Sequence, residues 1–206
     1  MKILILAVFP LLLSAQEKNE WSTTMKAAMS DIKEHNFEGA IKNLDRSLKI
    51  IPNNWSALYF KGYSQIILAR TEEGCSTLID AIYYGGNNET KKVYAEKCIE
   101  YDPQLNPEQF KSGKFTLQVL GSPSVYNFER KNGMQYEGEA GQVYSGTIKW
   151  FENGDYTIIP TEETKKIMTE NPRFLTRILK ISGNEYLYEK IEEEKQVQFG
   201  IIKKID

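Results

Sequence analysis

The chain carries one pattern twice, as WSTTMKAAMSDIKEHNFEGAIKNLDRSLKIIPNN (residues 21–54) and directly afterwards as WSALYFKGYSQIILARTEEGCSTLIDAIYYGGNN (residues 55–88). Small and apolar residues recur at matching offsets: Ala28, Ala40, Leu44 and Ser47 in the first stretch, and Gly62, Gly74, Leu78 and Ala81 in the second. A period of 34 residues with such residues at fixed offsets is typical of stacked helical hairpins. The N-terminal half is therefore predicted to be helical, and its repeat favours binding and assembly over catalysis.

The repeat and its breaks predict five helices, near residues 22–34, 37–50, 54–69, 72–84 and 89–101. Asn36 and the pairs Asn53-Asn54 and Asn87-Asn88 are the expected N-caps, because a short side-chain oxygen can accept from the first free backbone N–H groups. The fifth helix is polar on one face and apolar on the other, around Val93 and Tyr94. This pattern is expected of a cap that ends a stack of hairpins.

These residues resemble the tetratricopeptide repeat pattern, in which small residues let two antiparallel helices approach closely and Pro52 ends the second helix. The match departs from the family at Asp31, where an aromatic residue is usual, and at Lys61, where an apolar one is. In that family the first helix of each hairpin lines a groove that holds an extended peptide or a partner segment. By position, the resemblance implies a groove lined by Met25, Met29, Tyr59, Tyr63 and Ile66. The alternative is that this face packs on the C-terminal domain or on the fifth helix.

The chain has two cysteines, Cys75 and Cys98, both in the helical half. In an exported chain an even number favours a disulfide. Cys75 falls early in the fourth predicted helix and Cys98 late in the fifth, and the start of one helix lies beside the end of the next in an antiparallel pair. We expect a structural Cys75–Cys98 bond. A redox-active bond is the weaker alternative, because Cys-x-x-Cys spacing is absent.

After two prolines at 103 and 107 the sequence changes to alternating patterns that predict β-strands. The expected strands lie near residues 113–120, 124–130, 133–139, 143–151, 155–160, 174–182, 185–191 and 196–205, with a short helix or ordered loop at 161–170. Asn132-Gly133, Asn153-Gly154 and Gly183-Asn184 are hairpin-turn signals. The fold class is therefore predicted to be α+β, with helical hairpins in residues 20–102 followed by an antiparallel meander, barrel or half-barrel in residues 110–206.

A lipocalin-like barrel or half-barrel fits this meander, because closure protects the strand edges. Several short motifs are spread along this half: Lys111-Ser112-Gly113-Lys114-Phe115, Arg130, Gln135-Tyr136-Glu137, Lys149-Trp150 and Asp155-Tyr156. Together they look similar to a small β-rich domain of exported Bacteroidetes proteins. That resemblance implies a fold and a compartment but no chemistry.

Three polar residues of this half, Arg130, Gln135 and Glu137, are singled out as a candidate network. Gln135 and Glu137 share a face by strand alternation, and Arg130 can meet them across the Asn132-Gly133 hairpin. One interpretation is that they orient a small polar ligand inside a barrel. The other, which we favour from sequence alone, is a solvated cross-strand pair.

The N-terminus has the layout of a secretory signal peptide. One lysine precedes a run of about 11 apolar residues, which is too short for the roughly 20 that span a bilayer, and Ser14-Ala15 follows. We expect cleavage after Ala15, with residues 1–15 removed. No cysteine stands at that point to carry a lipid anchor. The sequence thus predicts a periplasmic or secreted protein without a stable membrane span after cleavage.

Composition and charge argue against several classes of function. The formal net charge is −2 and basic residues are scattered among acidic ones, so nucleic-acid binding has no electrostatic basis. The single histidine, His35, falls between two predicted helices and is expected to be a solvated turn residue rather than a metal ligand or a general base. We expect no catalytic residues, no metal and no cofactor; a hydrolase would have to rely on a carboxylate pair such as Glu137 with Asp155.

Two functions remain open from the sequence. The first is a non-enzymatic exported protein that contacts a protein or peptide partner in the periplasm or cell envelope. The second is a carrier that encloses a small apolar or amphipathic ligand in its β domain. A cavity of more than a few hundred cubic ångströms inside the sheet favours the carrier, and a filled interior excludes it.

Overall fold

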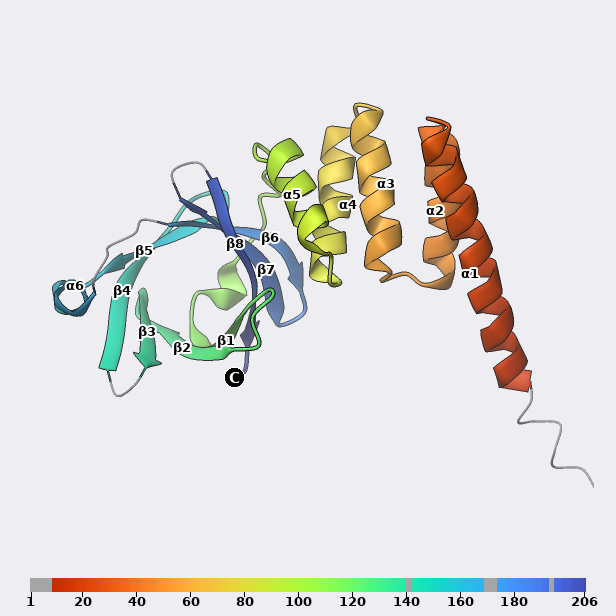
Figure 1. Ribbon diagram of the computed structural model, residues 1–206. Helices are drawn as coiled ribbons and strands as arrows, with labels where there is room; N and C mark the ends of the chain where they lie inside the picture. Colours follow the sequence, from red (N-terminus) through yellow and green to blue (C-terminus); the bar gives the residue numbers. More distant parts are fainter. Residues whose placement is uncertain (1–8, 140–141, 169–173, 193–194) are drawn as a thin grey trace, which may run out of the picture. The chain divides into compact units, whose positions relative to one another are not determined.

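The structure is a computed structural model, and it describes residues 9–139, 142–168, 174–192 and 195–206 (Figure 1). The chain divides into two compact units, Met1–Tyr101 and Asp102–Asp206. The described part of the first unit contains helices, and that of the second contains an antiparallel sheet with two short helical segments. The predicted α+β fold class is confirmed.

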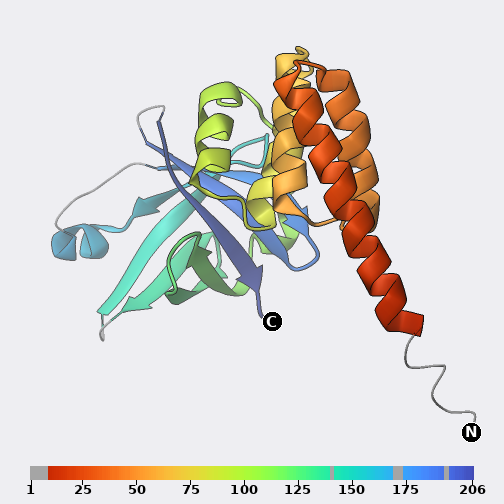
Figure 2. The ribbon, with the colours of Figure 1, turned by 45° about the vertical axis from the view of Figure 1, so that its right-hand side comes forward.

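Within the described residues, the first unit has five α-helices: α1 (Phe9–Lys33), α2 (Phe37–Ile50), α3 (Trp55–Ile67), α4 (Thr71–Tyr83) and α5 (Asn88–Lys97). Helices α1 and α2 lie against each other, as do α3 and α4, so that the unit consists of two hairpins followed by α5 (Figure 2). Asn36, Asn54 and Asn87 cap α2, α3 and α5 by accepting from the backbone N–H three residues on. These caps were predicted from the sequence.

The repeated small residues lie where the helices of a hairpin touch. A Cβ atom added to Gly62 would stand 2.9 Å from the carbonyl oxygen of Gly74, and one added to Gly74 would stand 2.9 Å from that of Gly62. The core cluster of the first hairpin contains Ala28, Ala40 and Leu44. The sequence repeat therefore corresponds to close helix–helix contact, as its pattern predicted.

Two predicted helix boundaries were wrong. Helix α1 begins at Phe9 rather than near residue 22, because residues 11–20 contain neither glycine nor proline to interrupt it. Helix α5 ends at Lys97 rather than near residue 101, because the backbone of Cys98 leaves the helical conformation. The predicted signal peptide, residues 1–15, includes residues 1–8, which lie outside the described residues. No described helix combines the length and apolarity that crossing a membrane would require.

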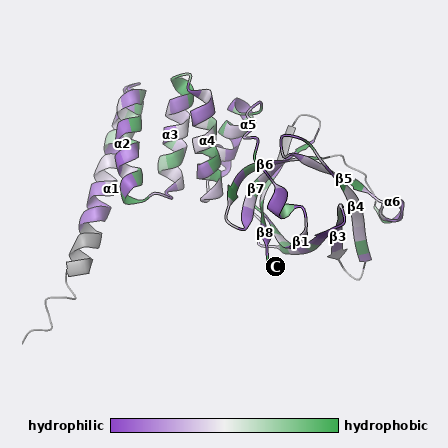
Figure 3. Ribbon diagram, turned by 180° about the vertical axis from the view of Figure 1, so that it is seen from behind, coloured by the Kyte–Doolittle hydropathy of each residue, from purple (hydrophilic) through white to green (hydrophobic). Residues whose placement is uncertain are grey.

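In the described residues the second unit is a closed barrel of eight antiparallel strands (Figure 3). They are β1 (Gly113–Val119), β2 (Val125–Lys131), β3 (Met134–Glu139), β4 (Gln142–Trp150), β5 (Tyr156–Pro160), β6 (Leu175–Ser182), β7 (Glu185–Glu192) and β8 (Lys195–Lys204). Each strand pairs with the next, and β8 pairs with β1. Closure leaves no free edge on which another strand could add. The sequence predicted a meander, a barrel or a half-barrel, and the structure is a full barrel.

Turn residues set the register of the hairpins. Asn132 and Gly133 both have positive φ, at 53° and 74°, as a tight two-residue turn requires. The turn pairs Arg130 with Gln135 and Phe128 with Glu137. The short helix α6 (Glu162–Ile167) lies within the segment predicted as a short helix or ordered loop at 161–170, of which residues 169 and 170 lie outside the described residues.

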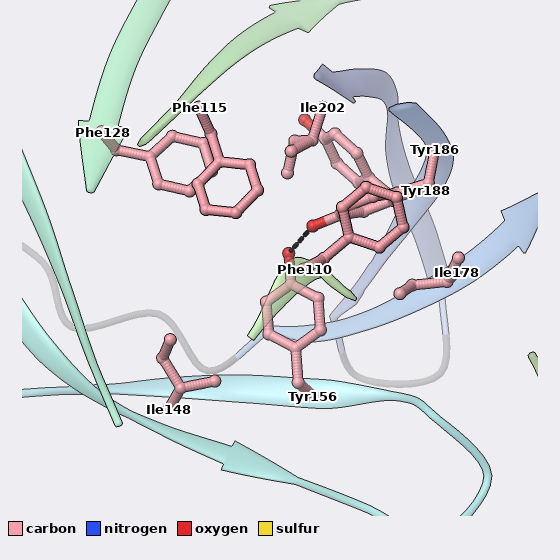
Figure 4. Packing of buried hydrophobic residues seen from close by; sticks show 9 residues of the cluster. All are labelled: Phe110, Phe115, Phe128, Ile148, Tyr156, Ile178, Tyr186, Tyr188 and Ile202. Atoms are coloured by element: carbon pink, nitrogen blue, oxygen red, sulfur yellow. Dashed lines mark hydrogen bonds between the residues drawn. The ribbon is translucent and has the colours of Figure 1, made fainter. Parts of the chain in front are cut away.

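One end of the barrel interior is filled by side chains. A short 3-10 turn, η1 (Glu108–Phe110), lies inside the ring of strands (Figure 1) and buries Phe110 completely. The buried cluster comprises Phe110, Phe115, Phe128, Ile148, Tyr156, Ile178, Tyr186, Tyr188 and Ile202 (Figure 4). The barrel therefore has a packed aromatic end that holds the neighbouring polar side chains in place.

Among the described strand pairs, β5 and β6 have the fewest aligned residues. Within the described residues, Tyr156 and Thr176 are the one aligned pair of this junction, whereas β7 and β8 are paired along most of their length. The Thr157 hydroxyl adds a hydrogen bond to the carbonyl oxygen of Phe174, at 2.8 Å. The ring of strands is thus closed by few backbone contacts at this point.

Candidate functional site

A buried arginine lies at the centre of the filled end. Arg130 is 1% exposed. Its Nε donates to Oε1 of Gln135 at 2.9 Å, Nη1 donates to the carbonyl oxygen of Phe110 at 3.0 Å, and Nη2 donates to the Tyr156 hydroxyl at 2.8 Å. Among the described residues no carboxylate forms an ion pair with it. The guanidinium is therefore held by neutral acceptors.

Aromatic rings surround the same guanidinium. Its carbon atom lies 5.2 Å from the ring centroids of Phe115 and Phe128, 5.4 Å from that of Trp150 and 4.7 Å from that of Tyr156. The negative faces of such rings attract a cation and offset part of its lost hydration. Burial lowers the pKa of Arg130, but the interactions with Tyr156 and Tyr186 outweigh burial and raise it overall. Arg130 therefore stays charged.

Two further polar groups extend this network to the wall of the barrel. Because the amide oxygen of Gln135 accepts from Arg130, its Nε2 is left to donate to Oε1 of Glu137, at 2.6 Å. Gln135 is 4% exposed, whereas Glu137 is exposed. The structure thus brings together the three residues singled out from the sequence. The solvated pair favoured from the sequence does not describe Arg130 and Gln135, because the closed barrel and η1 bury them.

Two tyrosines complete the filled end. The hydroxyls of Tyr156 and Tyr186 lie 3.0 Å apart and share a hydrogen bond, drawn as a dashed line in Figure 4. Burial raises the pKa of Tyr186 well above its usual value, against the opposing effect of Arg130. Both Tyr156 and Arg130 are therefore fixed from two sides, which leaves this end of the barrel rigid and closed.

The other part of the interior is a cavity of about 320 Å³. Its wall is part apolar and part polar, and is formed by Leu117, Val119, Tyr126, Asn127, Phe128, Gln135, Glu137, Gly138, Tyr144, Tyr156, Ile158, Thr176, Tyr188, Lys190, Gln198 and Ile202. A second hollow of about 240 Å³ shares Gln135, Glu137, Tyr144 and Ile158 with it. Glu137 therefore borders both spaces, and the Arg130 network supports the wall between them.

Tyr188 places a hydroxyl in the cavity wall. Its ring lies across Gly200 on the neighbouring strand, where an added Cβ would stand 2.4 Å from the hydroxyl oxygen. The hydroxyl accepts from Nε2 of Gln198 at 2.6 Å, and burial raises its pKa, so it keeps its proton. In the described residues that proton has no acceptor of its own. Tyr188 can therefore donate a hydrogen bond into the cavity.

Lys190 places a positive charge in the same wall. It follows Tyr188 by two residues on β7, so strand alternation turns both side chains to the interior. Its Nζ lies 5.1 Å from the ring centroid of Phe174, and no described carboxylate pairs with it. Sequence reasoning missed Tyr188 and Lys190, although their alternation with Leu187 and Glu189 was a usable signal.

The five residues of the predicted helical groove lie on α1 and α3. Met25 and Met29 border a shallow hollow of about 410 Å³ along α1, and Met25 also packs against the core of the first hairpin. Tyr59, Tyr63 and Ile66 lie on α3 and are partly buried, with the two tyrosine ring centroids 6.4 Å apart. Tyr59, Tyr63 and Ile66 do not border that hollow, whose wall comes from α1 alone.

The fifth helix approaches the α3 part of this predicted groove. Helix α5 contacts α3. Burial, and then the carboxylate of Glu89 on α5, raise the pKa of Tyr59. Glu89 of α5 therefore lies near enough to Tyr59 for its charge to act on the tyrosine hydroxyl.

The predicted disulfide between Cys75 and Cys98 is confirmed. It joins α4 to the residue that ends α5, with the two Cα atoms 5.6 Å apart. Both residues are buried. The bond therefore fixes the end of the last helix to the second hairpin.

Asp155 and Glu137 do not form a carboxylate pair in one cavity. Asp155 is buried in the turn between β4 and β5 and forms an ion pair with Arg177, with Nε and Oδ2 3.3 Å apart. Burial raises the pKa of Asp155, and Arg177 opposes this shift. Glu137 borders the cavity, whereas Asp155 does not. Among the described residues, no three or more His, Cys, Asp or Glu side chains are grouped so as to hold a metal ion.

The fold and this site define a closed eight-stranded antiparallel barrel whose interior is packed at one end and hollow at the other. In comparisons with protein-family models, curated proteins and solved structures, nothing matched the chain.

Proposed function

We propose that the protein is a non-enzymatic binding protein that encloses a small amphipathic molecule in its barrel. The observation that carries this proposal is the cavity of about 320 Å³ with a wall of mixed polarity. Ligand pockets span about 300–1,000 Å³, so this one lies at the lower end. Its apolar wall, including Leu117, Ile158 and Ile202, suits a hydrocarbon or ring, and its polar groups suit a head group.

The size of the cavity limits the ligand. At about 30 Å³ per molecule of liquid water, the cavity holds the volume of about ten waters. A long-chain lipid would extend beyond this space, so we propose a ligand of metabolite size. The packed end favours such binding, because a wall fixed by the Arg130 network loses little freedom when a ligand enters.

The helical hairpins support a second proposal, contact with a protein or peptide partner. It rests on the hollow along α1, where Trp21, Met25 and Met29 offer aromatic and thioether surface, which suits adaptable recognition. Export to the periplasm or the cell exterior stays a proposal that rests on residues 1–15 alone.

The binding proposal is tested with a variant that fills the cavity. The neutral dye N-phenyl-1-naphthylamine is titrated into the full chain, and its fluorescence should rise to saturation at one dye per protein. Leu117→Trp projects into the cavity and should abolish this rise. Thr116→Trp is the matched control, because residue 116 faces outward by strand alternation and should leave binding unchanged. Equal binding by both variants would show that the dye sits elsewhere and would refute the proposal.

A further inference from the structure

The cavity wall carries two opposite charges. Lys190 and Glu137 both border the cavity of about 320 Å³. Neither forms an ion pair among the described residues, with each other or with a third group. We propose that the ligand is a zwitterion, with a carboxylate at Lys190, an ammonium at Glu137 and an apolar middle between them. This inference rests on the proposed binding function and names its ligand class.

The anionic end of the ligand is assigned from two neighbouring donors on β7. Lys190 supplies an ammonium group, and Tyr188 supplies a hydroxyl proton that has no acceptor among the described residues. Both side chains face the interior because they are two residues apart on one strand. A carboxylate accepts from several donors at once, and such charged hydrogen bonds are stronger than neutral ones. The pair therefore fits a carboxylate better than a neutral carbonyl group.

The cationic end is assigned from Glu137. Its Oε1 accepts from Gln135, and Gln135 is fixed in turn by the buried Arg130, so this carboxylate is held in one place on the wall. Its remaining lone pairs can accept from an ammonium group. The rings of Tyr126 and Tyr144 border the same cavity, and aromatic faces add attraction for a cation.

A ligand of one charge fits this wall less well. An anion entering the cavity would satisfy Lys190 but would displace water from Glu137 without replacing it, and a cation would do the reverse. Removing water from a charge is costly unless a partner replaces it. A zwitterion replaces the water at both groups. Leu117, Ile158 and Ile202 cover the apolar middle.

The test uses probes that share one hydrocarbon skeleton. Isothermal titration calorimetry on the full chain at neutral pH compares 8-aminooctanoic acid with octanoic acid, octylamine and 1-octanol. The shorter 6-aminohexanoic and 4-aminobutanoic acids then vary the distance between the two charges. We expect the best zwitterion to bind about tenfold more tightly than either singly charged probe, as one added charged hydrogen bond implies.

Variants assign each end of the ligand. Lys190→Met should bring the best zwitterion down to the affinity of octylamine, and Glu137→Gln should bring it down to that of octanoic acid. Lys149→Met is the matched control, because Lys149 also has its Nζ near a phenylalanine ring, 5.4 Å from that of Phe151, but does not border the cavity. It should keep the wild-type preference. Glu129→Gln is the corresponding exposed control on β2.

The outcomes separate the inference from the function on which it rests. If octanoic acid, octylamine or 1-octanol binds the wild type as tightly as every zwitterion, the zwitterion assignment is wrong and the binding function stands. If none of the probes nor the neutral dye binds, both are wrong. A loss of preference in Lys149→Met equal to that in Lys190→Met would also overturn the assignment. The wild-type probe series decides the matter even if a cavity variant does not fold.

Discussion

Arg130 shows how a closed barrel can hold a buried charge without a carboxylate. Three hydrogen bonds and four aromatic rings replace its hydration. The same contacts fix the orientation of Gln135, and through it the position of Glu137. A side chain that is out of reach of solvent thus determines which polar atoms the cavity offers.

The first prediction concerns the loss of this charge. Arg130→Met removes the donor to Gln135, to Phe110 and to Tyr156, and should lower the free energy of unfolding by about 2–4 kcal/mol. Urea unfolding of wild type and variant measures the difference. Arg130→Lys keeps the positive charge, but its single ammonium nitrogen cannot reach three acceptors at once. Compared with Arg130→Met, it should therefore recover less than half of the lost stability. Full recovery with lysine would show that charge alone matters here.

The second prediction concerns Asp155, whose pKa is raised above the usual 3.8 mainly by burial. In the folded state the carboxyl therefore binds its proton more tightly than in the unfolded state. Its contribution to stability is fully present below pH 3.8 and falls as the pH rises through the higher folded-state pKa. As the pH rises from 3.8 through the folded-state pKa, the wild type should lose stability relative to Asp155→Asn. Above that pKa the difference between the two proteins should stay constant.

Denaturant unfolding of both proteins at a series of pH values measures this difference. A titration of the Asp155 carboxyl by NMR supplies an independent value. Stability of the wild type that instead increases relative to the variant with rising pH would mean that the ion pair with Arg177 outweighs burial. The raised pKa would then be wrong.

At the scale of single elements, the disulfide compensates for the shortness of α5. That helix has 10 residues, and isolated helices of fewer than about 12–15 residues are marginal in water. Cys98 forms its C-terminal cap and is tied to α4 across a sequence separation of 23 residues. The bond therefore holds a helix that would otherwise detach readily from the second hairpin.

We expect removal of this bond by Cys75→Ala/Cys98→Ala to lower stability by about 3 kcal/mol, the chain-entropy value for a closed loop of this length. Hydrogen exchange should speed up first at the amides of α5. Wild type treated with a reductant provides the control and should behave as the variant does. Unchanged protection of α5 in the reduced protein would contradict a structural role, and an unchanged mass on reduction would contradict the bond itself.

The helical elements could be predicted from the sequence where local signals specify them. Asn36, Asn54 and Asn87 mark helix starts by their own side chains. The early start of α1 could not be read in this way, because residues 11–20 contain neither glycine nor proline to separate them from the repeat. The end of α5 at Lys97 could not be read either, because residues 98–101 contain neither glycine nor proline to mark it.

The candidate site could be predicted only in part, because burial inside a barrel is a property of the closed sheet. Arg130, Gln135 and Glu137 were found through the Asn132-Gly133 turn, which sets their register locally. Whether Arg130 faces water or aromatic rings depends on η1, whose Phe110 accepts from Arg130 across a sequence separation of 20 residues. Lys190 lies on β7, several strands away from Glu137 on β3, and only closure of the barrel brings both to the same cavity.

On the scale of the whole molecule, the packed cluster and the proposed binding cavity occupy different ends of one barrel. The packed end contains the buried cluster and the Arg130 network, and the hollow end contains Lys190 and Glu137. Wall residues outside the buried cluster, such as Glu137 and Lys190, can therefore change without loss of the packed cluster. A scaffold of this kind suits changes of ligand, since the wall can vary while the packed end keeps the ring closed.

The sparse pairing between β5 and β6 makes this junction the place where the barrel is expected to open locally. Tyr156 and Thr176, the aligned pair of that junction, also border the cavity. Tyr156 itself is held by Arg130 and Tyr186, so the two strands would separate beyond it, where few backbone hydrogen bonds join them and local opening is least costly. A molecule held in the cavity would therefore be released on the timescale of this fluctuation, and residence time would be set by the wall of the barrel as much as by the contacts of the ligand.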